Sequence, residues 1–441
     1  LVEQVLLVGR EGARRVAQRA GRGPGRPPRP IIFRKCPARR PGPRPPDEQD
    51  LLDQCVALTS ASVSNPDAVS DALTAMLPDV AQTQADTGRA AAGAQFENLN
   101  TRMMGLRSGA PVPAFSFSGL TLAMAGGRLP LGQLGAALLA VDSTPAQEAS
   151  SFGKWGLFVS GNIGRGEFDP TRLTPRYDFD VAGLTAGLDY RWSNELVVGV
   201  ALGYTRQDTQ LAGGLGSVDM QGFSVSGYGT WYRDNDWYLD SALTYGANRY
   251  DQERSIAYVL PTEVVNQTAV ASSDGSNLSA TLTFGRDFSL RGWTFGAYGR
   301  AAYSRLGFDA FEEQVDASLN GSGLALRVES RTLTGFSSTV GGKASFAHSA
   351  SWGVLVPQMD VEWVKEYGSD AEAFRGFFVD DPTATPILVL GDDLDSSYLR
   401  LSLGLSMVLT QGRSGFLTYE RILARSGVSQ QGATLGLRWE F

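Results

Sequence analysis

The sequence has no stretch of eighteen consecutive apolar residues, the length that an α-helix needs to cross the hydrocarbon core of a membrane. Only 42% of its 441 residues are hydrophobic, whereas 52 are glycine. A membrane protein without such apolar runs has to use a closed β-barrel, because every backbone polar group in lipid needs an internal hydrogen-bond partner. The composition therefore excludes helical membrane spans and suits a protein made of many strands.

Histidine and cysteine are also scarce. His348 is the single histidine and falls in a predicted turn, which argues against a Ser–His–Asp triad, and neither a G-x-S-x-G elbow nor a phosphate-binding loop is present. One histidine and two cysteines cannot supply the four ligands of a structural zinc. We therefore predict no enzyme activity, no metal and no cofactor. Cys36 and Cys55 either form a disulfide in an oxidising compartment or remain two thiols, and the sequence does not choose between these alternatives.

Charge is distributed unevenly. Residues 1–46 are rich in arginine and proline and poor in acidic side chains, whereas the whole chain has a net charge of −7. Because the remainder is acidic, we expect no nucleic-acid partner. We predict that residues 1–46 are disordered, since they contain too little apolar matter to fold alone. No signal-peptide pattern is visible at Leu1, and residues 1–46 either belong to the native protein or come from a wrongly assigned start.

Residues 47–130 are predicted to be mainly helical. Asn65 followed by Pro66 offers a helix cap, after which Val69, Leu73 and Met76 fall on one face. We interpret this apolar face, and a second one formed by Phe96, Leu99, Met103 and Leu106, as core-facing or partner-facing. The segment LGQLGAALLAVD at 131–142 predicts one further helix close to the first strand.

From Trp155 onward the hydrophobic period changes to two. Within 179–192, apolar side chains occupy one face and small or polar ones the other, which is typical of a transmembrane strand. Twelve such segments follow one another, and twelve is an even number, as bacterial single-chain barrels require. They are 155–164, 179–192, 196–209, 220–232, 237–250, 277–288, 293–306, 330–346, 352–366, 397–409, 414–423 and 432–441.

The predicted connections differ in length between the two ends of these strands. Short turns at 193–195, 233–236 and 289–292 alternate with long connections at 251–276, 307–329 and 367–396. Short periplasmic turns opposite long external loops would give this asymmetry. Tryptophan and tyrosine recur near the strand ends, where an interfacial aromatic girdle is favoured over ordinary strand propensity.

The last segment, TLGLRWEF, places Leu435, Leu437, Trp439 and Phe441 on one face and ends the chain on an aromatic residue. Together with LTAGLDYRWSNELVVGVALGYTRQDT at 184–209, SWGVLVPQMDVEW at 351–363 and GFLTYERIL at 415–423, it resembles the autotransporter (type V secretion) β-domain family. The resemblance covers about residues 150–441. It implies that these four C-terminal residues form the signal that the barrel assembly machinery reads.

The resemblance also implies an architecture and a location. We expect a 12-stranded antiparallel transmembrane β-barrel at 155–441 in the outer membrane of a Gram-negative bacterium, monomeric, in contact with lipid and with loops at the cell surface. Residues 47–130 would then be a passenger remnant or linker region, and 131–154 the helical linker that threads the lumen. Glu420 and Arg438 are expected to face the lumen. Inward positions that are small enough to leave room for the linker are Gly183, Gly187, Gly199, Gly203, Thr244, Gly246, Thr281 and Gly285.

Two functions follow as alternatives. The first is export or anchoring of an N-terminal passenger, and the second is a stand-alone pore or surface adhesin with a vestigial passenger. Inward charges, among them Arg300, Arg400, Glu420 and Arg438, are interpreted as ion pairs in a solvated lumen. In some members of the family that the sequence resembles, lumen carboxylates have a self-cleaving role, and this remains the lesser interpretation.

Overall fold

The computed structural model describes residues 43–77, 79–107, 121–124, 127–130, 155–171, 174–233, 236–290, 292–350, 353–367, 374–389, 395–409 and 414–438. Three helices come first: α2 (Pro46–Ser64), α3 (Pro66–Ala75) and α4 (Asp79–Arg107). None of these helices is both long and apolar enough to span a bilayer. The predicted cap of α3 is confirmed, because the Asn65 side chain accepts a hydrogen bond from the Ala68 amide at 3.3 Å.

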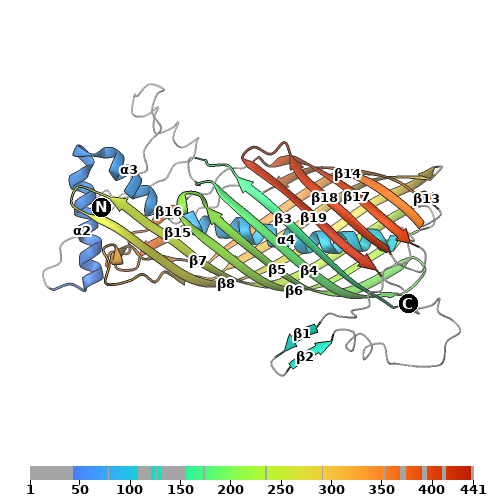
Figure 1. Cartoon of the computed structure of the whole chain (residues 1–441), viewed down its shortest axis with the longest axis horizontal. Coiled ribbons are helices and arrows are strands. Elements are labelled where there is room, and N and C mark those ends of the chain that lie inside the picture. The colour runs from blue at the N-terminus through green and yellow to red at the C-terminus, as the bar shows by residue number, and fades with distance from the viewer. Residues whose placement is uncertain are drawn as a thin grey trace.

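Twelve long antiparallel strands form the barrel (Figure 1). The predicted fold class is therefore confirmed. These strands are β3 (Trp155–Phe168), β4 (Tyr177–Arg191), β5 (Leu196–Leu211), β6 (Gly216–Tyr232), β7 (Trp237–Val259), β8 (Val264–Leu290), β9 (Trp293–Phe308), β12 (Arg331–Phe346), β14 (Gly353–Tyr367), β17 (Ser397–Leu409), β18 (Ser414–Leu423) and β19 (Val428–Arg438). A short strand, β13 (His348–Ala350), follows β12 and pairs with β14.

The barrel closes between its first and last strands. β19 pairs with β3 from Val428 opposite Phe168 to Leu435 opposite Gly161, and β12 pairs with β14. These pairings close the barrel along the seam, as a barrel in lipid requires. Outward side chains are apolar and exposed, for example Leu184, Val200 and Phe223, whereas buried inward positions are often polar. The hydrophobic face therefore points away from the lumen.

The two ends of the barrel differ. We call the end with the short turns at 192–195, 233–236 and 291–292 the turn end, and the opposite one the loop end. The prediction of a long loop at 251–276 is wrong: β7 and β8 continue as one hairpin of 23 and 27 residues that projects beyond the loop end. In this projecting part, Ile256 and Tyr258 are buried beneath helices, whereas Ala257 and Val259 are exposed. The alternation of buried and exposed positions therefore continues, although this part of the strand has no row of apolar side chains that faces lipid.

Short elements complete the loop end. The predicted connections 307–329 and 367–396 contain β10 (Phe311–Glu312), β11 (Leu326–Val328), β15 (Phe374–Phe378) and β16 (Ile387–Val389), which form a four-stranded sheet. Single 3-10 turns are η1 (Ala212–Gly214) and η2 (Ser322–Leu324). Within the range predicted to be mainly helical, β1 (Thr121–Met124) and β2 (Gly127–Pro130) instead form a hairpin.

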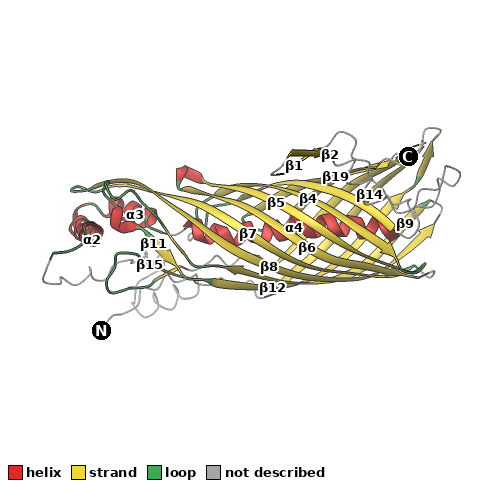
Figure 2. Cartoon of the chain, turned by 90° about the horizontal axis from the view of Figure 1, so that it is seen from below, coloured by secondary structure: helices red, strands yellow, loops and turns green. Residues whose placement is uncertain are grey.

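Helices α2 and α3 lie at the loop end and α4 lies inside the barrel (Figures 1 and 2). We call α2 and α3, with the projecting part of β7–β8 and the four-stranded sheet, the cap. Its core is apolar and includes Leu51, Leu58, Met76, Ile256, Leu324 and Leu326. The chain therefore reaches the barrel strands only after passing through the lumen as α4.

Candidate functional site: the lumen filled by a helix

Helix α4 runs along the lumen and contacts β3 through β9. Near the loop end, the Gln84 amide donates to the Ser273 hydroxyl at 2.8 Å, and the Thr87 and Thr209 hydroxyls lie 3.3 Å apart. Both contacts are buried. Polar groups removed from water have to be hydrogen-bonded, so these contacts match the polar helix to the polar wall.

A second set of hydrogen bonds holds the middle of α4. Asn98 donates to the Thr185 hydroxyl at 3.0 Å, and this hydroxyl donates in turn to Gln95 Oε1 at 2.8 Å. The Gln95 amide donates to the Ser226 hydroxyl at 3.3 Å. Helix and wall thus share one connected network, in which each group depends on its neighbours.

Arg102 provides the charged contact nearest the turn end. Its Nε donates to Asp189 Oδ2 at 2.9 Å, and its guanidinium lies 4.9 Å from the centroid of the Phe158 ring. Tyr228 also donates to Asp189, at 3.2 Å. Both charged side chains are almost fully buried. Removal of either one would leave the other charge buried without its partner, which is strongly destabilising.

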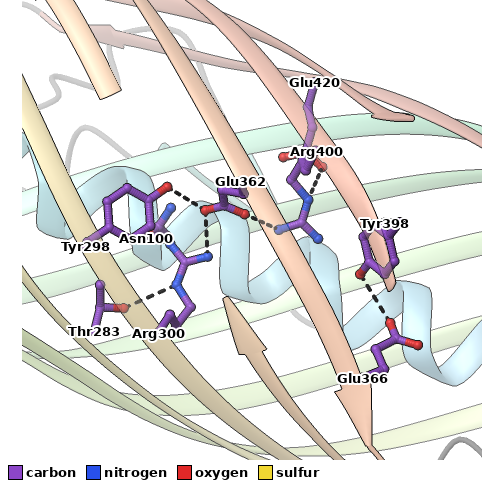
Figure 3. Close-up of polar contacts among 9 residues, drawn as sticks. All are labelled: Asn100, Thr283, Tyr298, Arg300, Glu362, Glu366, Tyr398, Arg400 and Glu420. Carbon is purple, nitrogen blue, oxygen red and sulfur yellow. Dashed lines mark hydrogen bonds and ion pairs between the residues drawn. The ribbon is translucent and has the colours of Figure 1, made fainter. Parts of the chain in front are cut away.

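A group of charged side chains lines the opposite wall (Figure 3). Glu362 accepts from Tyr298 at 2.6 Å, from Arg300 at 2.9 Å and from Arg400 at 3.0 Å. The two arginines therefore share one carboxylate, and each retains further donors. Arg300 contacts the Thr283 hydroxyl at 3.2 Å with its Nε.

This group reaches the helix and encloses a small cavity. Arg300 Nη2 donates to Asn100 Oδ1 of α4 at 3.4 Å, and Arg400 lies 3.5 Å from Glu420. The cavity has a volume of about 30 Å³, with Glu97 of α4 among its lining residues. A space of this size and polarity is large enough to hold water beside the helix.

The predicted inward positions have different neighbours. A Cβ on Gly203 would overlap the Gln95 amide of α4, whereas one on Gly183 would overlap the Asn162 side chain of the wall and lie 3.6 Å from Ala94 of α4. At Gly187, Gly199 and Gly285 the space is filled by aromatic rings on the same or adjacent strands, namely Phe158, Tyr228 and Tyr238. These three glycines accommodate wall side chains rather than the helix.

The remaining predicted positions contribute to the wall. Thr244 lies 2.8 Å from the Ser226 hydroxyl, Gly246 faces Asn277, and Thr281 pairs with Ala242 of β7. Glu420 contacts Arg400 as described, and Arg438 is the last residue of β19. Of the C-terminal set, Leu435 is exposed on the outer face and Leu437 lies in β19, whereas Trp439 and Phe441 fall outside the described residues.

Helix α4 lies within the range predicted to be helical, but its position in the lumen and its main partners were not predicted. It placed the lumen helix in 131–154, a range that lies outside the described residues, and the helix that the structure shows in the lumen is α4. The signal in the sequence for a helix in a polar lumen was a set of polar residues on α4, spaced by three, eight and three positions: Gln84, Thr87, Gln95 and Asn98. Cys55 is disulfide-bonded, and Cys36 lies outside the described residues.

The cap has its own polar anchors. Asp50 of α2 accepts from the Gly321 and Gly323 amides at 3.1 and 3.0 Å, and a Cβ on Gly323 would overlap the α2 backbone. Arg254 and Glu313 form a buried ion pair, with Nε to Oε1 at 2.8 Å. Burial, together with Asp47, Glu312 and Glu48 nearby, raises the pKa of Asp380. The cap is thus fitted closely to the loop-end connections.

A closed barrel with an apolar outer face and a helix through its polar lumen is a transmembrane barrel of the outer-membrane type. The autotransporter β-domain family matches residues 157–420, and the chain belongs to that family. Members of this family are outer-membrane proteins of Gram-negative bacteria. The translocator domain of the autotransporter NalP from Neisseria meningitidis has a similar fold, with a TM-score of 0.51 and 15% identity over 70% of this chain and 93% of that one.

Relatives are matched over limited lengths. The BrkA autotransporter of Bordetella pertussis is 40% identical over 84 residues, which is 18% of this chain and 8% of that protein. The adhesin BmaC autotransporter of Brucella suis is 26% identical over 188 residues, 40% of this chain and 5% of that protein. Esterase EstA of Pseudomonas aeruginosa is 26% identical over 165 residues, 37% of this chain and 25% of that protein. The chain therefore spans a quarter or less of these relatives.

Proposed function

We propose that this chain is the translocator unit of an autotransporter, which exports an N-terminal passenger or anchors it at the cell surface. The path of the chain through the lumen carries this proposal. Val80 of α4 lies beside Gly216 at the loop end, whereas Leu106 packs with Phe158 and Val197 at the turn end. The cap helices that precede α4 therefore lie at the opposite end of the barrel from the start of β3.

The orientation follows from the connections. Bacterial barrels have short periplasmic turns and longer extracellular loops. On this basis the loop end, with the cap, faces the cell exterior, and both ends of the strand series face the periplasm. A passenger joined to α2 would then emerge at the surface.

Assembly is proposed to depend on the C-terminal strand. β19 closes the barrel by pairing with β3, and Leu435, Leu437, Trp439 and Phe441 would be read by the barrel assembly machinery before closure. Lipid then covers the outer face of a monomeric barrel. Replacement of Phe441 by Asp should lower outer-membrane levels and increase periplasmic degradation, and unchanged heat-modifiable migration of the cell-envelope protein would contradict this role.

We assign no enzymatic function to the lumen. Glu362 is held by two arginines and a tyrosine, which supports a structural role for the charged group in fixing the wall beside α4. The protein purified from outer membranes should then have the mass of an uncut chain across α4. Cleavage within residues 79–107 of the parent protein, if it were absent from the Glu362→Gln variant, would overturn this assignment.

Export can be tested with a pair of tryptophan substitutions. A reporter fused ahead of residue 43 should appear on intact cells for the parent and for Val200→Trp, because Val200 is on the exposed outer face. Gly203→Trp should reduce display, because the ring would occupy space taken by Gln95 of α4. Barrel levels are matched by heat-modifiable migration. Equal display in all three proteins would refute passage of the chain through the lumen.

A further inference from the structure

An open groove of about 510 Å³ lies on the outer wall of the barrel over β7, β8, β9 and β12. Its lining includes Tyr245, Ser276, Leu278, Arg305, Asp309 and Thr332. The groove opens outward, because Tyr245, Leu278 and Arg305 are on the outward side of their strands, and the inward-facing Phe308 and Arg331 line its inner side. The cap and α4 have no part in this lining.

A row of small side chains produces the groove. Ala247 is paired with Ser276, Ser276 with Gly307, and Gly307 with Thr332, so four neighbouring strands present little bulk at the same register. A Cβ on Gly307 would lie only 3.0 Å from Ser276 Oγ. Glycine in a strand often marks a place where another group approaches the backbone closely.

Arg305 is the outward cation of this groove, because Arg331, the other lining arginine, donates to Ala81 and Gln84 of α4. It is exposed between Leu278 and Thr334 on the neighbouring strands, and no side-chain hydrogen bond or ion pair is formed by it within the described part of the chain. Some outward arginines are paired, as Arg165 is with Asp180 at 2.8 Å, whereas Arg305 is not. The guanidinium of Arg305 thus keeps its full set of donors for a ligand.

The position of Arg305 matches one membrane interface. It follows the outward Trp293 by twelve residues, which at about 3.3 Å per residue and a tilt of about 40° is roughly 30 Å along the membrane normal. This distance is close to the apolar band of about 25 Å on such barrels. Immediately below Arg305, Tyr303 and Phe336 are exposed on the outer face. The groove therefore lies where headgroups meet acyl chains.

The chemistry of the lining restricts the ligand. An unpaired guanidinium suits a phosphate, which it can bind through two parallel hydrogen bonds. Asp309 can accept hydrogen bonds from sugar hydroxyls, as can Ser276 and Thr332. Tyr245 and Leu278 offer apolar surface. A phosphorylated glycolipid combines a phosphate, hydroxyl groups and acyl chains in one molecule.

We propose that this groove binds the headgroup of a phosphorylated glycolipid in the outer leaflet. The phosphate contacts Arg305, the sugar hydroxyls contact Asp309 and Thr332, and the acyl chains run over Tyr303 and Phe336. Such a contact would fix the height and rotation of the barrel in the bilayer. This role is additional to export, and only its location in the outer leaflet depends on the orientation proposed above.

Native mass spectrometry of the full chain in detergent provides the test. Diphosphorylated lipid A is titrated against its dephosphorylated form and against phosphatidylethanolamine. The parent should retain one diphosphorylated molecule, and excess inorganic phosphate should not displace it. Arg305→Gln should weaken binding about tenfold, as expected for loss of a charge-assisted hydrogen-bonded pair. Gly307→Leu should weaken it by filling the groove.

The matched control is Arg421→Gln. Arg421 is also exposed on the outer face and forms no hydrogen bond or ion pair among the described residues, but it lies outside the groove. This variant should bind like the parent. Absence of binding to the parent, equal affinity of Arg305→Gln and Arg421→Gln, or equal retention of the dephosphorylated lipid or phosphatidylethanolamine would each overturn the proposal. Heat-modifiable migration verifies that every variant is folded.

Discussion

The cap and the lumen hold consecutive parts of one chain by different means. In the cap, α2 and α3 bury an apolar core against the projecting hairpin and the four-stranded sheet. In the lumen, α4 is held along much of its length by hydrogen bonds to threonine, serine and asparagine side chains of the wall. Its apolar contacts are divided between two clusters, one that includes Val80 and Ala91 near the loop end and one around Leu99 and Met103 near the turn end.

This difference fits the two tasks. Burial of apolar surface is the dominant favourable term in folding, so the cap is suited to retaining a segment once it has arrived. A typical hydrogen bond contributes only about 0.5–1.5 kcal/mol net, because water offers the same bonds. A hydrated polar lumen is therefore suited to a segment that has to slide through before it stops. The comparison predicts large effects in the cap and small ones at the lumen positions held by neutral hydrogen bonds.

The largest effect is expected at the cap ion pair. Arg254→Leu leaves the Glu313 carboxylate buried without its partner, which typically costs about 3–5 kcal/mol. Hydrogen exchange in residues 46–76 should become much faster, while α4 stays protected. Arg249 is the control, since its contact to Asp251 is exposed and 3.7 Å long. If Arg249→Leu and Arg254→Leu gave equal exchange, the cap would not depend on this pair.

The apolar core of the cap should respond nearly as strongly. Leu51 is 1% exposed, and Leu51→Ala is expected to destabilise cap docking by about 3 kcal/mol. Val56→Ala on the same helix should cost little, because Val56 is 54% exposed. Limited proteolysis of α2 in the purified protein measures both. If Leu51→Ala and Val56→Ala resisted proteolysis equally, the apolar core would not hold the cap in place.

A single lumen contact should matter less. Gln95→Ala removes the hydrogen bonds to Thr185 and Ser226 but leaves space for water, so we expect a loss of about 1 kcal/mol in protection of α4. Hydrogen exchange of residues 90–107 reports this loss. An effect as large as that of Arg254→Leu would remove the distinction between lumen and cap.

The smallest effect concerns pH. Because the folded pKa of Asp380 is raised, the docked cap binds a proton more tightly than the undocked one. Docking should therefore strengthen as the pH falls through the raised pKa, and the gain should be complete below the ordinary aspartate value of about 3.9. Hydrogen-exchange rates of the cap, corrected for the intrinsic effect of pH on exchange, measure this gain in docking. A pH response that persists in Asp380→Asn would assign it to another group.

The barrel was predictable because lipid imposes a simple rule. Outward side chains such as Val200, Leu202 and Phe223 have to be apolar, and this alternation revealed all twelve strands. Beyond the bilayer the rule no longer applies, so the continuation of β7 through Gln252 and Arg254 was predicted as a loop. There the buried positions contact the cap, which the local sequence does not specify.

The position of helix α4 in the lumen was missed for a related reason. An amphipathic stripe identifies helices that pack on apolar cores, but a helix in a polar lumen has no such requirement. Gln84, Thr87, Gln95 and Asn98 look like solvent-exposed positions until the inward threonines and serines of the wall are placed around them. Glycine at Gly203 was a sound local indication, whereas the glycines beside Phe158, Tyr228 and Tyr238 reflect packing within the wall.

The central claim is that α4 occupies the lumen, and single-channel conductance in a planar bilayer tests it most directly. The full chain should conduct poorly, because the helix and its partners fill most of the interior. Deletion of residues 79–107 should produce a large, stable increase in conductance, whereas deletion of 131–150 should leave it low, since α4 remains in place. High conductance of the full chain, or an increase confined to the 131–150 deletion, would contradict the account.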